Sequence, residues 1–206
     1  MPFSSQPPIP IKDKISVKYI VENLRDRVNI NMLAVAAEDC CEDRFVREED
    51  LHRPGLALAG YVKLFTYQRV QILGNTEHQF LENMSKQKQI SAFRNLLQFQ
   101  IPVIFLTDGN QLPDYLLILA EEAGIPVYST PYETTRFMHL LRDFLEDQFA
   151  LQTVVHGAMV DVYGIGILIV GRSGIGKSEV ALDLVERGHR LVADDVVMLT
   201  KKSSVL

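Results

Sequence analysis

Cysteine is scarce in this sequence of 206 residues, and long apolar runs are absent. Its two cysteines are neighbours, Cys40 and Cys41, and a metal site would need further cysteine or histidine at ligand spacing nearby. We therefore expect two reduced thiols. The longest apolar stretch, residues 164–171, is far shorter than the roughly 20 residues that a membrane-spanning helix needs. The sequence thus predicts no membrane-spanning segment.

An excess of basic charge is also missing. Lysine and arginine together number 21, aspartate and glutamate 26, and the formal net charge is -5. No overall positive field is available to attract nucleic acid or an anionic membrane surface, so neither is expected as a partner. Residues 1–14 contain four prolines and no apolar segment of the kind that forms a secretory signal. These features predict a flexible lead-in and a cytoplasmic protein.

Hydrophobic residues make up 47% and charged residues 23% of the chain, a composition typical of folded proteins. Hydrophobic periodicity predicts an alternation of strands and helices up to residue 149. The expected strands are residues 30–36, 69–74, 102–107 and 125–129. The expected helices are residues 17–28, 77–84, 85–98, 113–123 and 136–149, with caps at Ser16, Thr76, Ser85 and Thr134 or Thr135. This rhythm predicts an α/β domain over residues 15–150, with a mainly parallel sheet covered by helices.

The pattern changes after Ala150. Two β-rich runs, residues 153–162 and 165–170, are joined by Tyr163-Gly164, which predicts a hairpin and a new domain over residues 151–206. A glycine-rich loop, a helix over residues 177–187 and a strand over residues 190–193 follow. A segment this short is close to the size at which a separate core becomes marginal, so we expect the domain to be incomplete at its C-terminus.

The glycine-rich loop carries the clearest chemical signal. It consists of Gly171, Arg172, Ser173, Gly174, Ile175, Gly176, Lys177 and Ser178. These residues fit the phosphate-loop pattern G-x-x-x-x-G-K-[ST] between an expected strand and an expected helix. Backbone N–H groups of such a loop cradle phosphate oxygens, the lysine reaches the terminal phosphates, and the serine hydroxyl binds Mg²⁺. The alternative interpretation is an ordinary glycine-rich turn with a solvated lysine.

Three further side chains are candidates with weaker signals. Asp194 and Asp195 follow a short apolar run, and carboxylates beside a phosphate loop can bind Mg²⁺ or accept a proton. A solvated turn would explain the same pair. His156 lies in a β-rich run, where a lone histidine is more often structural.

Together, several segments resemble the HPr kinase/phosphorylase family. They are His156-Gly157, Asp161-Val162-Tyr163-Gly164, the loop 171–178 with Glu179, and residues 187–195. Upstream, Arg53-Pro54-Gly55-Leu56, Ala59-Gly60 and residues 69–74 with Glu77 resemble that family's N-terminal domain. The likeness covers most of the chain.

The resemblance implies a bifunctional enzyme with a phosphoenolpyruvate carboxykinase-like kinase domain. Such an enzyme phosphorylates a serine of HPr, the phosphocarrier of the bacterial sugar phosphotransferase system, and removes the phosphate by phosphorolysis. ATP or pyrophosphate would be the donor, Mg²⁺ the cofactor, and a homo-hexamer the usual assembly. The loop 171–178 would bind nucleotide phosphates, Ser178 would bind Mg²⁺, and His156, Lys177 and Asp195 would be the catalytic residues, with Asp195 as proton acceptor.

The sequence departs from the family pattern at two points, and two alternative interpretations of the chain remain open. Arg172 stands where an acidic residue is expected, and a metal-binding glutamate and an arginine of the family fall beyond residue 206. The chain could instead be a non-catalytic fragment, with a sensor or assembly domain and a nucleotide-binding stub. An unrelated phosphate-loop kinase or NTPase is a further alternative. The residues of the N-terminal domain form no second catalytic set, which favours a regulatory or assembly role.

Overall fold

A computed structural model describes residues 9–28 and 31–201 and divides the chain into two compact units. Of the described residues, 12–149 form one unit, and 9–11 together with 150–201 form the other. The division between Phe149 and Ala150 lies one residue from the predicted boundary. The predicted lead-in falls partly outside the described residues, which begin at residue 9.

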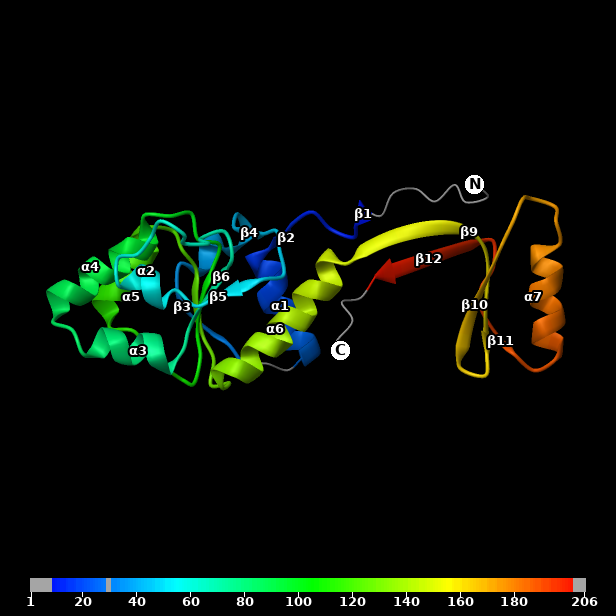
Figure 1. The fold of residues 1–206 in the computed structure, drawn as a ribbon. Coiled ribbons are helices and arrows are strands. Elements are labelled where there is room, and N and C mark those ends of the chain that lie inside the picture. Colours follow the sequence, from blue (N-terminus) through cyan, green and yellow to red (C-terminus); the bar gives the residue numbers. More distant parts are fainter. Residues whose placement is uncertain (1–8, 29–30, 202–206) are drawn as a thin grey trace. The chain divides into compact units, whose positions relative to one another are not determined.

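The unit of residues 12–149 alternates strands and helices, as the periodicity predicts (Figure 1). Its elements are β2 Ile15–Ser16, α1 Val17–Val28, β3 Leu33–Ala36, the 3-10 helix η1 Glu38–Glu42, β4 Phe45–Val46, β5 Leu51–His52, α2 Gly55–Leu58, β6 Val70–Leu73, α3 Asn75–Glu82, α4 Lys86–Leu97, β7 Ile104–Leu106, α5 Asp114–Glu122, β8 Val127–Ser129 and α6 Thr134–Phe149. Both cysteines are free thiols, as expected.

The main sheet of this unit has the strand order β3-β8-β7-β6-β5. The pairs β5–β6, β6–β7 and β7–β8 are parallel, and only the edge strand β3 runs antiparallel to its neighbour β8. All four residues of β6 and all three of β7 are buried, as is usual for parallel strands with helices on both faces. The predicted mainly parallel α/β sheet is confirmed.

Successive side chains of each strand point to opposite faces, and this alternation divides the core in two. Val70, Ile72 and Phe105 belong to a cluster with the apolar faces of α1 and α6. Leu73, Ile104 and the remaining strand residues of the second cluster pack with α2, α3, α4 and α5. The unit is therefore a three-layer sandwich of helices, sheet and helices (Figure 1).

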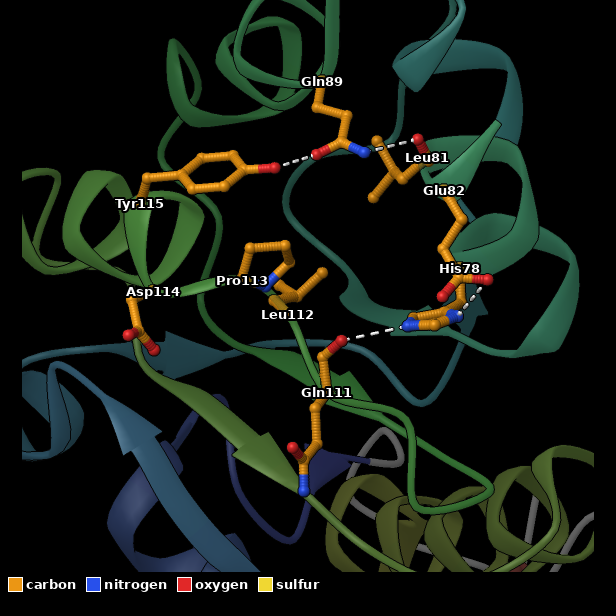
Figure 2. A pocket seen from close by; sticks show the side chains of 9 residues that line it. All are labelled: His78, Leu81, Glu82, Gln89, Gln111, Leu112, Pro113, Asp114 and Tyr115. Carbon is orange, nitrogen blue, oxygen red and sulfur yellow. Dashed lines mark hydrogen bonds and ion pairs between the residues drawn. The ribbon is translucent and has the colours of Figure 1, made fainter. Parts of the chain in front are cut away.

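Within the second helical layer, α3, α4 and the start of α5 surround a cavity of about 560 Å³. Figure 2 shows its wall tied together by hydrogen bonds between these elements. No side chain that the sequence singled out for catalysis lies there.

Two predicted helix caps are wrong. Helix α3 begins after Gly74 rather than at a cap residue Thr76, because the Glu77 carboxylate reaches back and accepts a hydrogen bond from the Gly74 N–H at 3.0 Å. Helix α6 is capped by Glu133 rather than by Thr134 or Thr135. Its carboxylate accepts from the backbone N–H groups of Thr135 and Arg136, both at 3.0 Å, and these bonds hold the pKa of the Glu133 carboxyl below its usual range.

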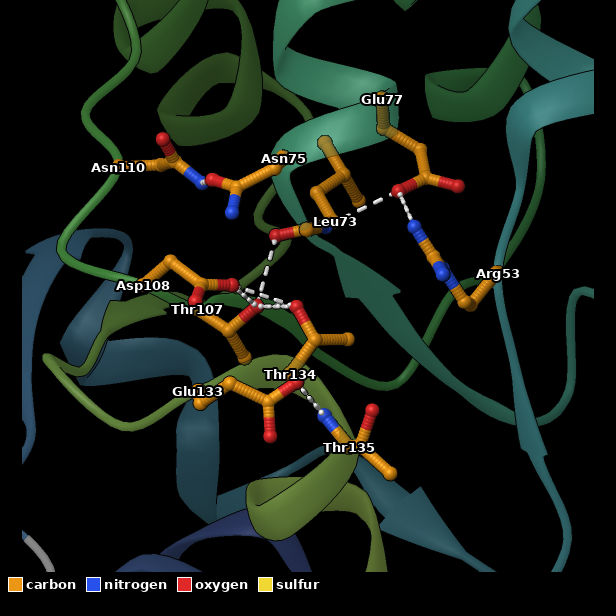
Figure 3. A network of polar contacts seen from close by, with 11 residues as sticks. Arg53, Leu73, Asn75, Glu77, Thr107, Asp108, Asn110, Glu133, Thr134 and Thr135 are labelled. Atoms are coloured by element: carbon orange, nitrogen blue, oxygen red, sulfur yellow. Dashed lines mark hydrogen bonds and ion pairs between the residues drawn. The ribbon is translucent and has the colours of Figure 1, made fainter.

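A polar network occupies the carboxyl ends of β6 and β7 (Figure 3). The buried carboxylate of Glu77 pairs with Arg53 at 2.6 Å, and the hydroxyls of Thr107 and Thr134 lie 2.7 Å apart. Thr134 also donates to Asp108 at 2.6 Å. These contacts give Arg53 and Glu77, two residues of the family resemblance, a role in joining α3 to the sheet.

The other unit is an antiparallel sheet with one helix packed on it. Its elements are β1 Ile9–Pro10, β9 Leu151–Val162, β10 Ile165–Val170, α7 Lys177–Glu186, β11 Arg190–Ala193 and β12 Val196–Lys201. Residues 9–10 are therefore a strand paired with β9, which corrects the predicted lead-in at those positions. The hairpin of β9 and β10 agrees with the prediction, whereas β12 was not predicted.

Strand β9 organises this unit because it is long enough to pair with four other strands. Its residues 159–161 pair with β10 on one edge and with β11 on the other, and its first half pairs with β12. Ala181 of α7 is buried against Ala158 and Val160 of β9. Among residues 9–28 and 31–201, no helix is both long and apolar enough to span a membrane.

Candidate functional site

The predicted phosphate loop lies between β10 and α7, as the motif requires. Gly174 and Gly176 have φ values of 77° and 94°, in the left-handed region that side chains other than glycine rarely adopt. Gly171 is restricted in a different way, because a Cβ there would lie 3.0 Å from the Ile175 side chain. The glycines thus allow the sharp path that ends at the first turn of α7.

Lys177 is the first residue of α7, and its side chain folds back across the loop. Its Nζ donates a hydrogen bond to the backbone carbonyl of Arg172 at 3.1 Å. The Arg172 side chain is exposed, so the departure from the family pattern at this position leaves the backbone of the loop intact. The ammonium group and the N-terminal end of the helix therefore contribute positive charge at the same place.

The two aspartates lie between β11 and β12, where the edge of the sheet changes from one strand to the other. Ser178 Oγ donates to Asp194 Oδ1 at 3.1 Å, which joins this junction to the start of α7. Asp195 has a φ of 66°, so the chain turns sharply here. The Asp195 carbonyl accepts a hydrogen bond from the Gly157 N–H at 3.2 Å, which holds the turn against β9.

His156 reaches the same junction from β9. Its Cα partner in the antiparallel register is Val196, the residue after Asp195, and its side chain is exposed. The fold therefore brings the three predicted regions, namely the loop, the aspartate pair and His156, to one end of α7 and the adjacent sheet edge. Spacing in the sequence alone does not reveal this, because His156 and Asp195 are separated by the whole loop and helix.

Another part of the resemblance has a structural role. Asp161 Oδ1 accepts a hydrogen bond from the Gly164 N–H at 2.7 Å and so shapes the hairpin turn. Asp161 Oδ2 pairs with Arg190 at 3.2 Å, and the ring of Tyr163 meets His189 edge-on with centroids 4.9 Å apart. These contacts connect the β9–β10 turn to the start of β11. They set the position of the strand that leads into Asp194 and Asp195.

Gly157 should be intolerant of substitution. A Cβ at this position would lie 2.4 Å from the backbone oxygen of Ile169, and neither strand can move without breaking the β9–β10 ladder. We expect Gly157→Ala to lower the free energy of unfolding by about 2–3 kcal/mol, measured by urea unfolding.

Gly166 in the same hairpin is the matched control. A Cβ there would lie 2.5 Å from Cε of Met159, the end of a flexible side chain that can rotate away. We expect Gly166→Ala to change the free energy of unfolding by less than about 1 kcal/mol. Equal effects of the two substitutions would contradict the assigned role of the close backbone approach at Gly157.

The oxygen donors of the site suit magnesium. Within the described part of the chain, no group of three or more histidine, cysteine, aspartate or glutamate side chains is arranged to hold a metal ion. However, Mg²⁺ commonly uses only one or two protein oxygens and completes its shell with phosphates and water. The Ser178 hydroxyl and the Asp194 carboxylate, already 3.1 Å apart, are a donor pair of that kind.

Both units of the chain match families of known proteins. Residues 15–145 match the family described as HPr Serine kinase N terminus, and residues 147–206 match the HPr Serine kinase C-terminal domain. The chain is 53% identical to the HPr kinase/phosphorylase of Chloroherpeton thalassium over 94% of its own length and 57% of the relative. It is 51% identical to the protein of that name from Chlorobium limicola over 95% of its own length and 59% of the relative. The chain thus spans less than two thirds of these relatives.

A solved structure shows a weaker likeness. It is the regulatory region of Clostridium perfringens pyrophosphatase, with CBS and DRTGG domains, complexed with the activator diadenosine tetraphosphate. The identity is 14%, the TM-score is 0.44, and the match covers 65% of this chain and 51% of that one. This likeness is too low to support an inference.

Proposed function

The chain belongs to the HPr serine kinase family, and we propose that the protein containing it transfers the γ-phosphoryl group of ATP to a serine hydroxyl of HPr. The observation that carries this proposal is the Ser178–Asp194 hydrogen bond, which joins the phosphate loop to the aspartate pair. A phosphate-binding element and a candidate proton acceptor on the adjacent residue are then close enough to serve one reaction. Transfer to a protein serine requires both.

The phosphate loop would hold the donor. Backbone N–H groups of residues 171–178 and the N-terminal end of α7 would bind phosphate oxygens, and the Lys177 ammonium would move from the Arg172 carbonyl to those oxygens. Ser178 and Asp194 would hold Mg²⁺. The bound ion would neutralise negative charge on the phosphates. Most of the rate enhancement in phosphoryl transfer comes from positioning and charge of this kind.

Asp195 would accept the proton of the serine hydroxyl as the serine oxygen bonds to the γ-phosphorus and the bond to the bridging oxygen of ADP breaks. His156, exposed beside this turn, would contact a phosphoryl oxygen. In the phosphorolytic direction, an oxygen of inorganic phosphate would bond to the phosphorus of phosphoserine and the bond from that phosphorus to the serine oxygen would break. Pyrophosphate would form, and the protonated Asp195 would give its proton to the departing serine oxygen. One carboxyl group can serve both directions by microscopic reversibility.

The family resemblance extends the proposal to the setting of the reaction. Pyrophosphate would be a second phosphoryl donor, and the kinase domain would share the phosphoenolpyruvate carboxykinase-like fold. The protein would act in the cytoplasm as a homo-hexamer and control carbon metabolism through the phosphotransferase system. The unit of residues 12–149 would have a regulatory or assembly role.

The direct test is phosphoryl transfer by the full-length natural protein that contains this sequence. We expect incubation with ATP, Mg²⁺ and HPr to produce phosphoserine in HPr, detected by intact mass and peptide mapping. Addition of inorganic phosphate should then remove the phosphate and release pyrophosphate. Nucleotide hydrolysis that is fast without HPr, with no phosphoserine formed, would contradict the proposed transfer to HPr.

A further inference from the structure

The cavity between α3, α4 and α5 has the properties of a binding site for a small molecule. Its volume of about 560 Å³ is within the range of small-molecule sites. All its lining residues belong to the unit of residues 12–149, and none belongs to the proposed phosphate loop. Leu81, Leu112 and Pro113 supply an apolar surface, and the remaining lining is polar (Figure 2).

The wall of this cavity is held by hydrogen bonds between different elements. His78 Nε2 lies 2.9 Å from the backbone carbonyl of Gln111, which connects α3 to the segment before α5. The Tyr115 hydroxyl is hydrogen-bonded to Gln89 Oε1, which connects α5 to α4. Gln89 is buried, and its Nε2 donates to the Leu81 carbonyl at 2.9 Å. The cavity is therefore formed before any ligand arrives, which lowers the entropic cost of binding.

These bonds also determine which hydrogen-bonding capacity is left for a ligand. A carbonyl only accepts, so His78 Nε2 must be the donor to Gln111, and Nδ1 of the neutral ring is an acceptor. Gln89 uses its amide N–H in bonds to carbonyls, so its oxygen accepts from the Tyr115 hydroxyl. The tyrosine oxygen then keeps only acceptor capacity toward the cavity.

The charged side chains at the cavity also favour a ligand that donates hydrogen bonds. Glu82 and Asp114 are both exposed at the cavity and, as carboxylates, are acceptors only. His78 Nδ1 and Glu82 Oε2 lie 3.6 Å apart, so one donor could bond to both, although Glu82 Oε2 also accepts from Gln79 Nε2 at 3.2 Å. In addition, the Lys86 ammonium lies over the ring of Tyr115, a residue of this wall, 4.6 Å from its centroid, in a cation–π contact.

We propose that this cavity binds a small aliphatic amine in its ammonium form. The ammonium group supplies the hydrogen-bond donors and the positive charge that the acceptors and carboxylates lack, and an aliphatic stem covers the apolar surface. A diamine offers one ammonium group to each of the two carboxylates, Glu82 and Asp114, which come from different elements. This inference is independent of the proposed phosphoryl transfer, because it concerns the other unit of the chain.

The probe for the test is putrescine, titrated into the 206-residue chain and followed by ¹H–¹⁵N correlation NMR. We expect saturable shifts of amide signals from the cavity residues. The uncharged analogue 1,4-butanediol, with hydroxyls in place of the ammonium groups, should give no saturable shifts. Equal binding of putrescine and the diol would overturn the proposal, and so would the absence of saturable shifts with putrescine.

Four variants test which side chains contribute to putrescine binding. Glu82→Gln and Asp114→Asn each remove one negative charge at an exposed position and should weaken putrescine binding about tenfold. Lys86→Gln removes a competing positive charge and should strengthen binding about twofold to threefold. Glu122→Gln is the control, because Glu122 is exposed on α5 but is not among the cavity residues, and it should leave the affinity unchanged. A loss with Glu122→Gln equal to that with Glu82→Gln would show only nonspecific charge attraction and overturn the proposal.

Discussion

Replacing Lys177 with alanine should lower the rate of phosphoryl transfer from ATP to HPr about a thousandfold in the full-length protein. The ammonium group lies at the start of α7 and donates to the Arg172 carbonyl across the loop, so it is near the place where we propose that the donor phosphates bind. Its removal takes away the mobile positive charge but leaves Gly174 and Gly176, which shape the loop. Transfer rate and nucleotide affinity should both be measured.

The control for this substitution is Lys201→Ala, which removes a lysine that is exposed at the end of β12. We expect it to leave the transfer rate unchanged, so that a general loss of positive charge is separated from the loss of Lys177. Lys177→Ala should also weaken binding of ATP about tenfold or more. Undiminished transfer by the Lys177→Ala protein would rule out the role that we propose for the phosphate loop.

Asp195→Asn should lower the transfer rate by a similar factor, about a thousandfold, while nucleotide affinity stays within about twofold of the original. The amide cannot accept the serine proton, whereas the loop that we propose binds the donor is not altered. Asparagine is the appropriate replacement because Asp195 has a φ of 66°, a backbone conformation that asparagine adopts more readily than alanine. The hydrogen bond from the Gly157 N–H to the backbone carbonyl of residue 195 should therefore remain.

The contrast between the two variants identifies the proton acceptor. Single-turnover transfer measures the rate of the chemical step. Equilibrium binding of a fluorescent nucleotide measures the affinity of the protein for nucleotide. Asp183→Asn, an exposed substitution on α7 at a residue paired with Arg187 at 3.0 Å, serves as the control and should leave both unchanged. If Asp195→Asn weakened nucleotide binding as much as it slowed transfer, the residue would act on the donor rather than on the serine proton.

Local sequence patterns predicted much of the N-terminal unit. The buried strands β6, β7 and β8 are flanked by turn residues, and α1 and α6 carry continuous apolar faces, so their existence follows from periodicity. The helix starts were less predictable. Thr76 and Thr134 are good cap residues by type, but the Glu77 and Glu133 carboxylates take the free backbone N–H groups instead.

In the second unit, local sequence patterns predicted less of the strand pairing. Strand β12 was not predicted because its apolar residues are partly exposed and its register depends on β9, which lies far away in the sequence. The pairing of residues 9–10 with β9 has the same origin. Partners that are distant along the chain leave no local periodic signal.

The sequence by itself determined the α/β alternation, the hairpin at Tyr163-Gly164 and the glycine-rich loop before α7, because each depends on neighbouring residues and on backbone freedom at particular glycines. Only the tertiary structure decided which side chains meet. Antiparallel pairing with β9 sets His156 beside the Asp195 turn, and packing of α7 brings Ser178 to Asp194. The acceptor-lined cavity likewise depends on three helices that meet through contacts between distant residues, which no local pattern records.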